Sequence, residues 1–321
     1  MANKPIADYV KLPGLDEYKE WFKDYFDLRR EDGILEVTMK TKGGPMYWSG
    51  GAHRAMSQLM RVISMDRENE ILIWTHKGPD WMMDGDIGGW EQYEANRFEH
   101  QFNDDTDLIK NMLFDINIPT ISAQQGSGFH WDSAVLCDIT VCAEDVRYDD
   151  MHLQLGLVPG DGMGLLLQHL LGAKKGNYYM YTSRQFTAQQ ALDWGFVSEV
   201  VPKGQALDRA WEIARLLKSV PYETRMLTGI IAKRPLRKMY VEDFETSTLA
   251  EQLSSFIKVS QNEVGDPTKA QVNEGYCGSG MHWRYNPEVD TMLKPQTAET
   301  WKEIRNLGPE YTKWWEQPKY D

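Results

Sequence analysis

The sequence is poor in cysteine, in positive charge and in long apolar runs. Its three cysteines, Cys137, Cys142 and Cys277, are an odd number and form no CxxC pair, which argues against a disulfide framework and a cysteine metal centre. We expect them to be reduced and structural. Lysine and arginine number 35 against 48 acidic residues, and the net charge of −13 disfavours nucleic acid and anionic membranes as partners.

Membrane segments and cofactor loops are also missing. No apolar run is long enough to span a bilayer, and the charged, Pro- and Gly-broken start contains no apolar signal-peptide core, so a cytoplasmic protein is expected. No GxGxxG-type loop occurs, and no His, Cys or carboxylate cluster has ligand spacing. We therefore expect neither a nucleotide cofactor nor a metal site.

What is present is a repeated alternation of strand and helix patterns within 321 residues, of which 41% are hydrophobic. Segments 34–41 ("ILEVTMKT") and 70–77 ("EILIWTHK") are rich in β-branched and aromatic residues, which predicts two strands. A helix is predicted between them from the spacing of Ala55, Met56, Leu59, Met60 and Ile63. The chain thus begins with a strand, helix, strand unit.

The alternation continues to about residue 203. Residues 105–116 are amphipathic, 118–125 predict a strand, an apolar helix is expected to end near Cys137, and "CDITVCAED" predicts the next strand. Thr187 and Gln190 fit a capping box, Gly195 fits a helix C-terminal stop, and "FVSEVV" predicts a further strand. The domain prediction is a core over 1–203, a helical region over 204–263, and a Trp- and Tyr-rich arm over 264–321 that packs on the body.

The order of these parts, with "GLVPGDG" after a strand and then the capped helix and "VSEVV", resembles the crotonase (enoyl-CoA hydratase/isomerase) superfamily over roughly residues 30–258. The resemblance implies an α/β crotonase fold, a spiral of repeated ββα units followed by helices. It also implies a homotrimer or a dimer of trimers. In that family, two backbone N–H groups form an oxyanion hole, and the matching stretches "MMDGDI" and "GSGFHWDSAVLCDI" place the donors at Gly85 and Phe129.

The acid and base positions differ from those of hydratases, which use two glutamates. The first glutamate matches Asp132, the second matches His152, and Asp161 replaces a small residue in the Pro-Gly-Asp-Gly turn. Each residue taken alone also has an ordinary structural interpretation. Asp161 would be a turn residue, and His152 would be a polar side chain whose hydrogen bonds are satisfied. Together they suit a base and its orienting group. The resemblance to the β-diketone hydrolases of the superfamily rests on His152 and Asp161 together with Trp48, His53, His130 and Glu251.

The predicted activity is hydrolysis of a carbon–carbon bond in a small hydrophobic cyclic β-diketone by a retro-Claisen reaction, with no cofactor. His152 is predicted to deprotonate water with Asp161 holding its imidazole, while His130, Trp48 and the backbone hole stabilise the enolate. Glu251 or His53 would manage the final proton, and Asp132 is a secondary participant. Two alternatives stay open: a coenzyme A thioester hydrolase or hydratase of the same fold, and a non-catalytic binding protein.

Overall fold

The structure is a computed structural model that describes residues 12–41, 43–85, 103–104, 106–150, 152–153 and 157–262. The arm predicted over 264–321, including Cys277, lies outside the described residues. Its packing and the predicted domain boundaries therefore stay predictions. Cys137 and Cys142 are buried free thiols, and burial raises the pKa of each to about 12 and about 11.

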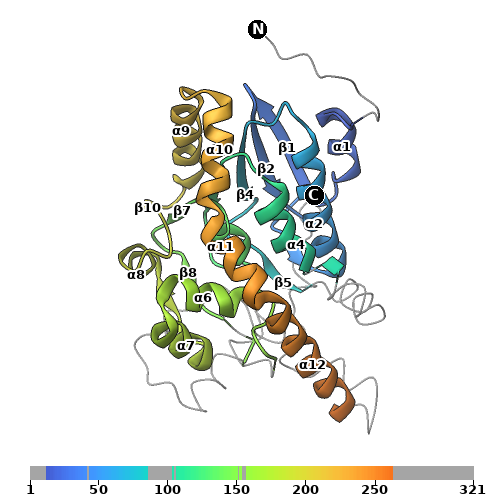
Figure 1. Ribbon diagram of the computed structural model, residues 1–321, viewed down its shortest axis with the longest axis vertical. Helices are drawn as coiled ribbons and strands as arrows, with labels where there is room; N and C mark the ends of the chain where they lie inside the picture. The colour runs from blue at the N-terminus through green and yellow to red at the C-terminus, as the bar shows by residue number, and fades with distance from the viewer. Residues whose placement is uncertain are drawn as a thin grey trace.

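A six-stranded mixed sheet forms the centre of the molecule (Figure 1). Its strands, in spatial order, are β1 (Phe26–Glu31), β2 (Ile34–Met39), β4 (Ile71–His76), β6 (Thr120–Gln124), β7 (Ile139–Ala143) and β10 (Glu199–Val201). β1 and β2 form an antiparallel hairpin, and every later pair in the sheet is parallel. The strands predicted at 34–41, 70–77 and 118–125 are confirmed as β2, β4 and β6.

Two small sheets stand beside the large one. β3 (Tyr47–Trp48) pairs in parallel with β5 (Met83–Gly85), and β8 (Arg147–Tyr148) pairs antiparallel with β9 (Phe186–Thr187). Along the chain, β3, β5 and β8 each follow directly after a strand of the large sheet, which is β2, β4 and β7 in turn, and helices follow each of these pairs. This is the predicted α/β spiral of the crotonase fold, which is confirmed.

The helices cover both faces of the large sheet and extend beyond its lower end (Figure 1). They are α1 (Leu15–Trp21), α2 (Gly50–Met65), α4 (Thr106–Lys110), a π-helical turn η2 (Asn111–Asp115), α5 (Asp132–Val135), α6 (Met163–Leu171), α7 (Ala173–Thr182), α8 (Ala188–Asp193), α9 (Ala206–Lys218), α10 (Tyr222–Ala232), α11 (Arg234–Met239), a second π-helical turn η3 (Tyr240–Phe244) and α12 (Glu245–Asn262). The capping box of Thr187 and Gln190 is confirmed at the start of α8. The helix expected to end near Cys137 is a single turn, α5. None of the helices among the described residues combines the length and apolar character needed to cross a bilayer.

The two faces of the sheet bury two apolar clusters. On one face α9 packs against the isoleucines of β2, β4 and β6, and the indole N–H of its Trp211 donates to Glu36 Oε2 at 2.6 Å. On the other face α2 buries its apolar stripe against Leu35, Val37 and the aromatic residues of the larger cluster. Since β-strand side chains alternate between faces, the mixed pattern of β2 supplies both clusters.

The candidate site residues come from segments that follow the carboxyl ends of parallel strands. β3 follows β2, the loop with His130 follows β6, and the segment with Asp150 follows β7. Parallel strands bring such segments together at one edge of a sheet. Gly128 permits this convergence, because a Cβ there would lie 2.5 Å from both the backbone N and O of Met82.

Candidate active site

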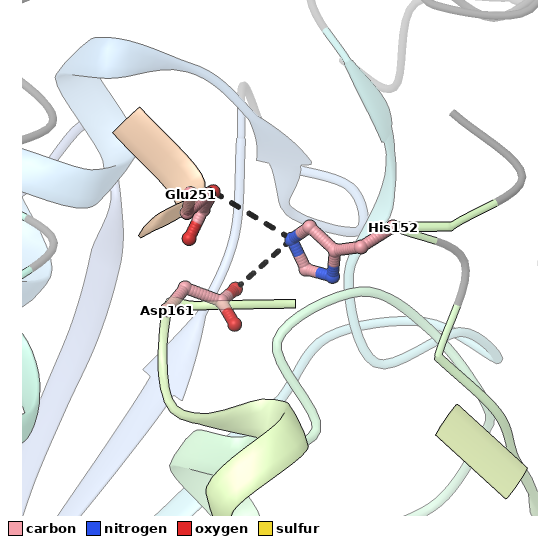
Figure 2. Close-up of side chains that lie close together, drawn as sticks. All are labelled: His152, Asp161 and Glu251. Carbon is pink, nitrogen blue, oxygen red and sulfur yellow. Dashed lines mark ion pairs between the residues drawn. The ribbon is translucent and has the colours of Figure 1, made fainter. Parts of the chain in front are cut away.

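His152 is surrounded by three carboxylates. Its Nδ1 lies 2.8 Å from Asp150 Oδ1, and its Nε2 lies 3.5 Å from Asp161 Oδ2 and 3.8 Å from Glu251 Oε1. Figure 2 shows the Nε2 edge of the ring directed at the carboxylates of Asp161 and Glu251. All three carboxylate residues are buried. We call His152, Asp150, Asp161 and Glu251 the acidic half of the site.

Local backbone structure fixes two of these carboxylates. Asp150 Oδ1 also accepts the backbone N–H of His152 at 3.0 Å, so the two residues form an Asx turn that sets both ends of the contact. Asp161 precedes α6, and its Oδ1 accepts the N–H of Met163 at 3.2 Å, which leaves Oδ2 facing the histidine. The Gly-rich turn therefore aims Asp161 rather than only reversing the chain.

Glu251 reaches the site from α12, far along the chain. A Cβ on Gly160 would lie 2.2 Å from Ser247 O and 2.5 Å from Glu251 Cβ, so only glycine lets this turn approach the helix so closely. The helix buries Glu251 while Leu249 and Leu253 on its other side are 56% and 60% exposed. Glu251 is therefore a buried carboxylate on a helix whose neighbouring leucines are exposed, the reverse of the usual arrangement of a helix.

The carboxylates control the charge of His152. Burial by itself lowers the pKa of an imidazole, but Asp161, Asp150 and Glu251 raise the pKa of His152 well above 6.5. The pKa of Asp161 is raised by burial, an effect that His152 and His130 oppose. The carboxylates thus favour the protonated form of His152, and burial makes Asp161 more basic than an ordinary aspartate.

Asp161 lies beside His152 as predicted, but it is not the carboxylate at Nδ1 of the ring. We expected Asp161 to orient the imidazole, as the aspartate of a catalytic triad does through Nδ1. In the structure Asp150 occupies Nδ1, and Asp161 lies on the opposite, Nε2 side. The Asx turn is the physical reason, because it ties the nearer carboxylate to the same residue's backbone. Asp150 was missed by the sequence reasoning, and its only signal was a carboxylate two residues before the histidine.

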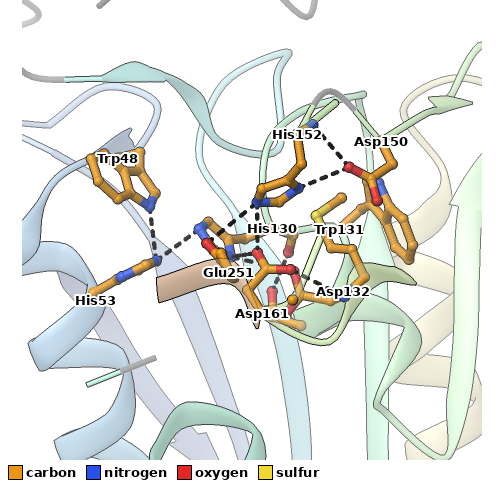
Figure 3. A network of polar contacts seen from close by, with 12 residues as sticks. Trp48, His53, His130, Trp131, Asp132, Asp150, His152, Asp161 and Glu251 are labelled. Atoms are coloured by element: carbon orange, nitrogen blue, oxygen red, sulfur yellow. Dashed lines mark hydrogen bonds and ion pairs between the residues drawn. The ribbon is translucent and has the colours of Figure 1, made fainter. Parts of the chain in front are cut away.

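The remaining candidates, which are all aromatic and include no carboxylate, form what we call the neutral half of the site, made of Trp48, His53 and His130 (Figure 3). The indole N–H of Trp48 donates to His53 Nε2 at 2.8 Å, and that same nitrogen lies 2.7 Å from His130 Nε2. An indole N–H can only donate, so His53 Nε2 is an acceptor and the proton in the second contact belongs to His130. The Trp48 N–H thus binds His53 in this structure, and its predicted use on the substrate stays a prediction.

His130 connects the two halves. Its Nδ1 lies 3.4 Å from Asp132 Oδ1 and 4.0 Å from Asp161 Oδ2, while its Nε2 faces His53. Its backbone has a φ of +50°, a left-handed conformation that is uncommon for a residue with a side chain. Trp81 holds this conformation by donating its indole N–H to the His130 carbonyl at 3.0 Å. Such strained residues concentrate at functional sites.

The predicted backbone oxyanion hole is altered. The N–H of Phe129, its second donor, is bound to the carbonyl of Met82 at 3.1 Å, so it does not point into an open site as predicted. The glycine-permitted approach of the loop to Met82 is the cause. Gly85, the first donor, ends β5 opposite Trp48, and its role stays a prediction.

Taken together, the predicted side chains occupy one continuous network of polar contacts (Figure 3). Asp161 Oδ2 faces an imidazole on each side, His152 at 3.5 Å and His130 at 4.0 Å. A buried carboxylate between a protonated imidazole and a second histidine can accept a proton while its neighbour donates one. Such a site is equipped for proton transfer at two adjacent positions of a small substrate.

Comparison with solved structures places this architecture beside a known hydrolase. A β-diketone hydrolase from the cyanobacterium Anabaena, bound to (S)-3-oxocyclohexyl acetic acid, is 31% identical with a TM-score of 0.70, over 74% of this chain and 96% of that one. An enoyl-CoA hydratase/isomerase from Mycobacterium paratuberculosis is 20% identical with a TM-score of 0.66, over 72% and 93% of the two chains, which shows a shared fold.

Sequence comparison gives a second group of relatives. Carnitinyl-CoA dehydratases are 37% identical in Salmonella arizonae and 34% in Salmonella paratyphi A, each over 134 residues. The match covers 41% of this chain and spans about half the length of these relatives, 51%. Residues 79–261 match the enoyl-CoA hydratase/isomerase family. With more than half of its length in that match, the chain belongs to the enoyl-CoA hydratase/isomerase family, the crotonase superfamily.

Proposed function

We propose that this protein hydrolyses a carbon–carbon bond of a small hydrophobic cyclic β-diketone by a retro-Claisen reaction. The observation that supports this most is Asp161, a buried carboxylate between two imidazoles at the site where hydratases of the family use glutamates. The similarity to the Anabaena β-diketone hydrolase supports the same reaction class. The set of site residues also resembles that of 6-oxocamphor hydrolase, another β-diketone hydrolase of this superfamily.

The first step adds water to one carbonyl of the diketone. In the revised mechanism the His152 imidazolium donates a hydrogen bond to a substrate carbonyl oxygen rather than deprotonating water, because its carboxylate neighbours keep it protonated. Asp161, made more basic by burial, accepts the proton of the attacking water with His130 beside it. The product of this step is a tetrahedral adduct.

The second step breaks the bond to the carbon between the two carbonyls. The electron pair of that bond moves onto the second carbonyl as an enolate, and the attacked carbon becomes a carboxylic acid. The proton taken by Asp161 returns to the central carbon, which leaves a keto acid and consumes one water. Glu251 and His53 are placed to hold protons at either side of this transfer, and no cofactor is required because the second carbonyl accepts the electrons.

The neutral half of the site provides the positioning. Trp48 and His53 hold His130 through the chain of contacts between their ring nitrogens. Asp132 contacts His130 and acts on the substrate only through it. Gly85 remains the proposed backbone donor, and Phe129 is left out of that role because its N–H is engaged.

A direct test uses the bicyclic 1,3-diketone that opens to 3-oxocyclohexyl acetic acid, the compound bound by the Anabaena hydrolase. Purified protein should convert it to the keto acid, with one heavy oxygen from labelled water in the new carboxylate. Absence of conversion with this and other cyclic 1,3-diketones, by protein that is folded, would refute the proposal.

The second candidate is a coenzyme A thioester hydrolase or hydratase, which the carnitinyl-CoA dehydratase relatives favour. Incubation with acyl- and enoyl-CoA thioesters, read by thiol release and loss of the conjugated thioester absorbance, separates the two activities. Stabilisation by coenzyme A alone would favour this candidate, and stabilisation by neither ligand class would favour a non-catalytic binding protein.

A homotrimer or a dimer of trimers remains part of the proposal. The residues Leu249, Leu253 and Ile257 follow one another at helical spacing on α12 and are 43–60% exposed. An apolar stripe of this kind supports burial against another subunit. Sedimentation of the full chain tests this expectation, and a stable monomer would contradict it.

A further inference from the structure

Three side chains of the acidic half have the composition and arrangement of a metal site. The Nε2 of His152, a carboxylate oxygen of Asp161 and one of Glu251 all lie within 4.8 Å of one another (Figure 2). Asp161 and Glu251 are 6% and 7% exposed. This separates the group from the exposed acidic clusters that are common on protein surfaces. The residues come from two loops and a distant helix, so no ligand spacing in the sequence could reveal them.

The distances approach those of a coordination shell. Ligands at about 2.0–2.1 Å from a tetrahedral zinc ion lie about 3.3 Å from one another. The histidine nitrogen is 3.5 Å from Asp161 Oδ2 and 3.8 Å from Glu251 Oε1. A cation bound here would draw these atoms closer together, to about 3.3 Å from one another. A water or a substrate oxygen would complete the shell.

Asp150 supplies the outer contact typical of a metal-binding histidine. Such a histidine almost always donates its other ring N–H to a carboxylate or carbonyl, which fixes the tautomer and aims the free nitrogen at the metal. Here Asp150 Oδ1 accepts from His152 Nδ1 at 2.8 Å and from the His152 backbone N–H at 3.0 Å. Nε2 is thereby directed between Asp161 and Glu251, and a bound cation would replace the proton that this nitrogen carries in the metal-free protein.

The charge balance favours a cation. Across the described residues, neither Asp150 nor Asp161 forms an ion pair with lysine or arginine, and both face His152. Asp161 also faces His130 Nδ1 at 4.0 Å, so the basic groups beside it in the described part of the chain are imidazoles. Buried charges of this kind are usually paired or coordinate a metal, and a divalent cation compensates them better than a single proton does.

We propose that His152, Asp161 and Glu251 bind one Zn²⁺-type divalent cation, with Asp150 as the positioning residue on the opposite ring nitrogen. One imidazole with two carboxylates suits zinc or a similar first-row ion better than Mg²⁺, which prefers oxygen ligands and retains its waters. This inference does not rest on the proposed function, since binding is measured without substrate. The cation would take the atoms that the retro-Claisen mechanism uses, so we expect it to inhibit that reaction reversibly.

The test is a calorimetric titration of chelator-treated full-length protein with Zn²⁺ near neutral pH, with Mg²⁺ in a parallel titration. We expect one zinc ion per chain and no comparable Mg²⁺ binding. His152→Asn should weaken zinc binding by more than about 100-fold, and Asp150→Asn, which leaves the three ligands in place, by about 10–100-fold. His169→Ala, which removes an exposed histidine of α6, is the matched control and should bind zinc as the wild type does.

Zinc affinity is compared only among variants that are folded. Thermal melts in the absence of metal establish the folding of each variant. Equal zinc affinity in wild type, His152→Asn and Glu251→Gln would overturn the site, as would a wild-type chain that binds no zinc. Glu251→Gln keeps the side-chain shape, so it answers the question if the histidine variant fails to fold. Loss of diketone hydrolysis bears on the proposed function alone, because zinc binding is scored independently of it.

Discussion

The two halves of the site use buried histidines in opposite ways. In the acidic half, His152 faces Asp150 through Nδ1 and Asp161 through Nε2, and its pKa is well above 6.5. In the neutral half, His53 accepts an indole N–H and contacts a second imidazole. The partners, more than burial, therefore decide whether a histidine of this site is a charged donor or a neutral acceptor.

The halves also differ in where they come from. The neutral half is built on β3, the start of α2 and the loop after β6, whereas the acidic half joins the turns around α6 to α12. His130 and Asp161 lie where they meet, 4.0 Å apart. Substitutions in the acidic half should therefore affect the chemistry directly, and those in the neutral half should act through His130.

The largest effect is expected from Asp161→Asn. An amide cannot accept the proton of the attacking water and removes a charge that favours the His152 imidazolium, so turnover should fall by about 10²–10⁴-fold. Substrate binding should be largely retained, because a base acts mainly in the transition state. The measurement is kcat and KM on the bicyclic diketone. Asp145→Asn, at an exposed carboxylate paired with Lys203, is the control and should leave both constants unchanged. Retention of more than about a tenth of wild-type turnover in Asp161→Asn would remove this residue as the base.

Burial is the main influence on the pKa of His76, and its contrast with His152 should appear in stability against pH. Burial lowers the pKa of His76 to about 4, and its Nε2 accepts the N–H of Gln125 at 2.9 Å. As the pH falls from 6.5 towards 4, the unfolded chain binds a proton that the folded chain does not, so stability should drop by up to about 3 kcal/mol. His152 has the opposite sign. Its raised pKa contributes stability that is complete below pH 6.5 and is lost as the pH rises through the folded-state pKa.

Urea unfolding at a series of pH values measures both contributions. His76→Gln should flatten the acid side of the stability profile, and His152→Gln should flatten the side above neutrality. His169→Gln, at an exposed position, should leave the profile unchanged. An unaltered acid limb in His76→Gln would mean that this histidine is not held neutral by burial.

Gly160→Ala tests the connection of α12 to the acidic half. The added methyl group would press on Ser247 O and Glu251 Cβ, and overpacking of this kind costs about 1–3 kcal/mol. The helix with Glu251 and the turn with Asp161 would be forced apart, which lengthens the contacts around His152. We expect a lower midpoint of urea unfolding and a reduced kcat. Gly14→Ala is the control, because no atom lies within 4 Å of a Cβ there. A Gly160→Ala protein with wild-type stability and turnover would show that the close approach of α12 is dispensable.

The sequence predicted the fold well because the helices and strands depend on local residue patterns. The β-branched segments, the stripe of α2 and the capping box at Thr187 each depend on neighbours within a few residues, and each is confirmed. The residues of the site were also named from the sequence, through their positions in the resemblance. What the sequence did not contain was their orientation around His152.

Orientation is decided by contacts between distant segments and by single turns. Asp150 rather than Asp161 holds Nδ1 because of one Asx turn, and the Phe129 N–H is lost to Met82 because a glycine lets two loops approach. Apart from Asp150, the residues of the site were the same in the prediction and in the structure. The roles changed because hydrogen-bond direction depends on fractions of an ångström that no spacing pattern records.

The smallest effect is expected in the neutral half, from Trp48→Phe. Phenylalanine keeps an aromatic ring beside His53 but loses the indole N–H that donates to Nε2 at 2.8 Å. A hydrogen bond of this kind contributes about 1 kcal/mol, so the weaker positioning of His53 and His130 should reduce kcat about five- to tenfold. Because the effect acts through His130, the pH dependence of kcat should shift while KM changes little. Trp21→Phe removes an indole that is 57% exposed and should alter neither. A loss in Trp48→Phe as large as in Asp161→Asn would mean that the indole N–H leaves His53 and binds the substrate directly, and the two halves would then share the chemistry equally.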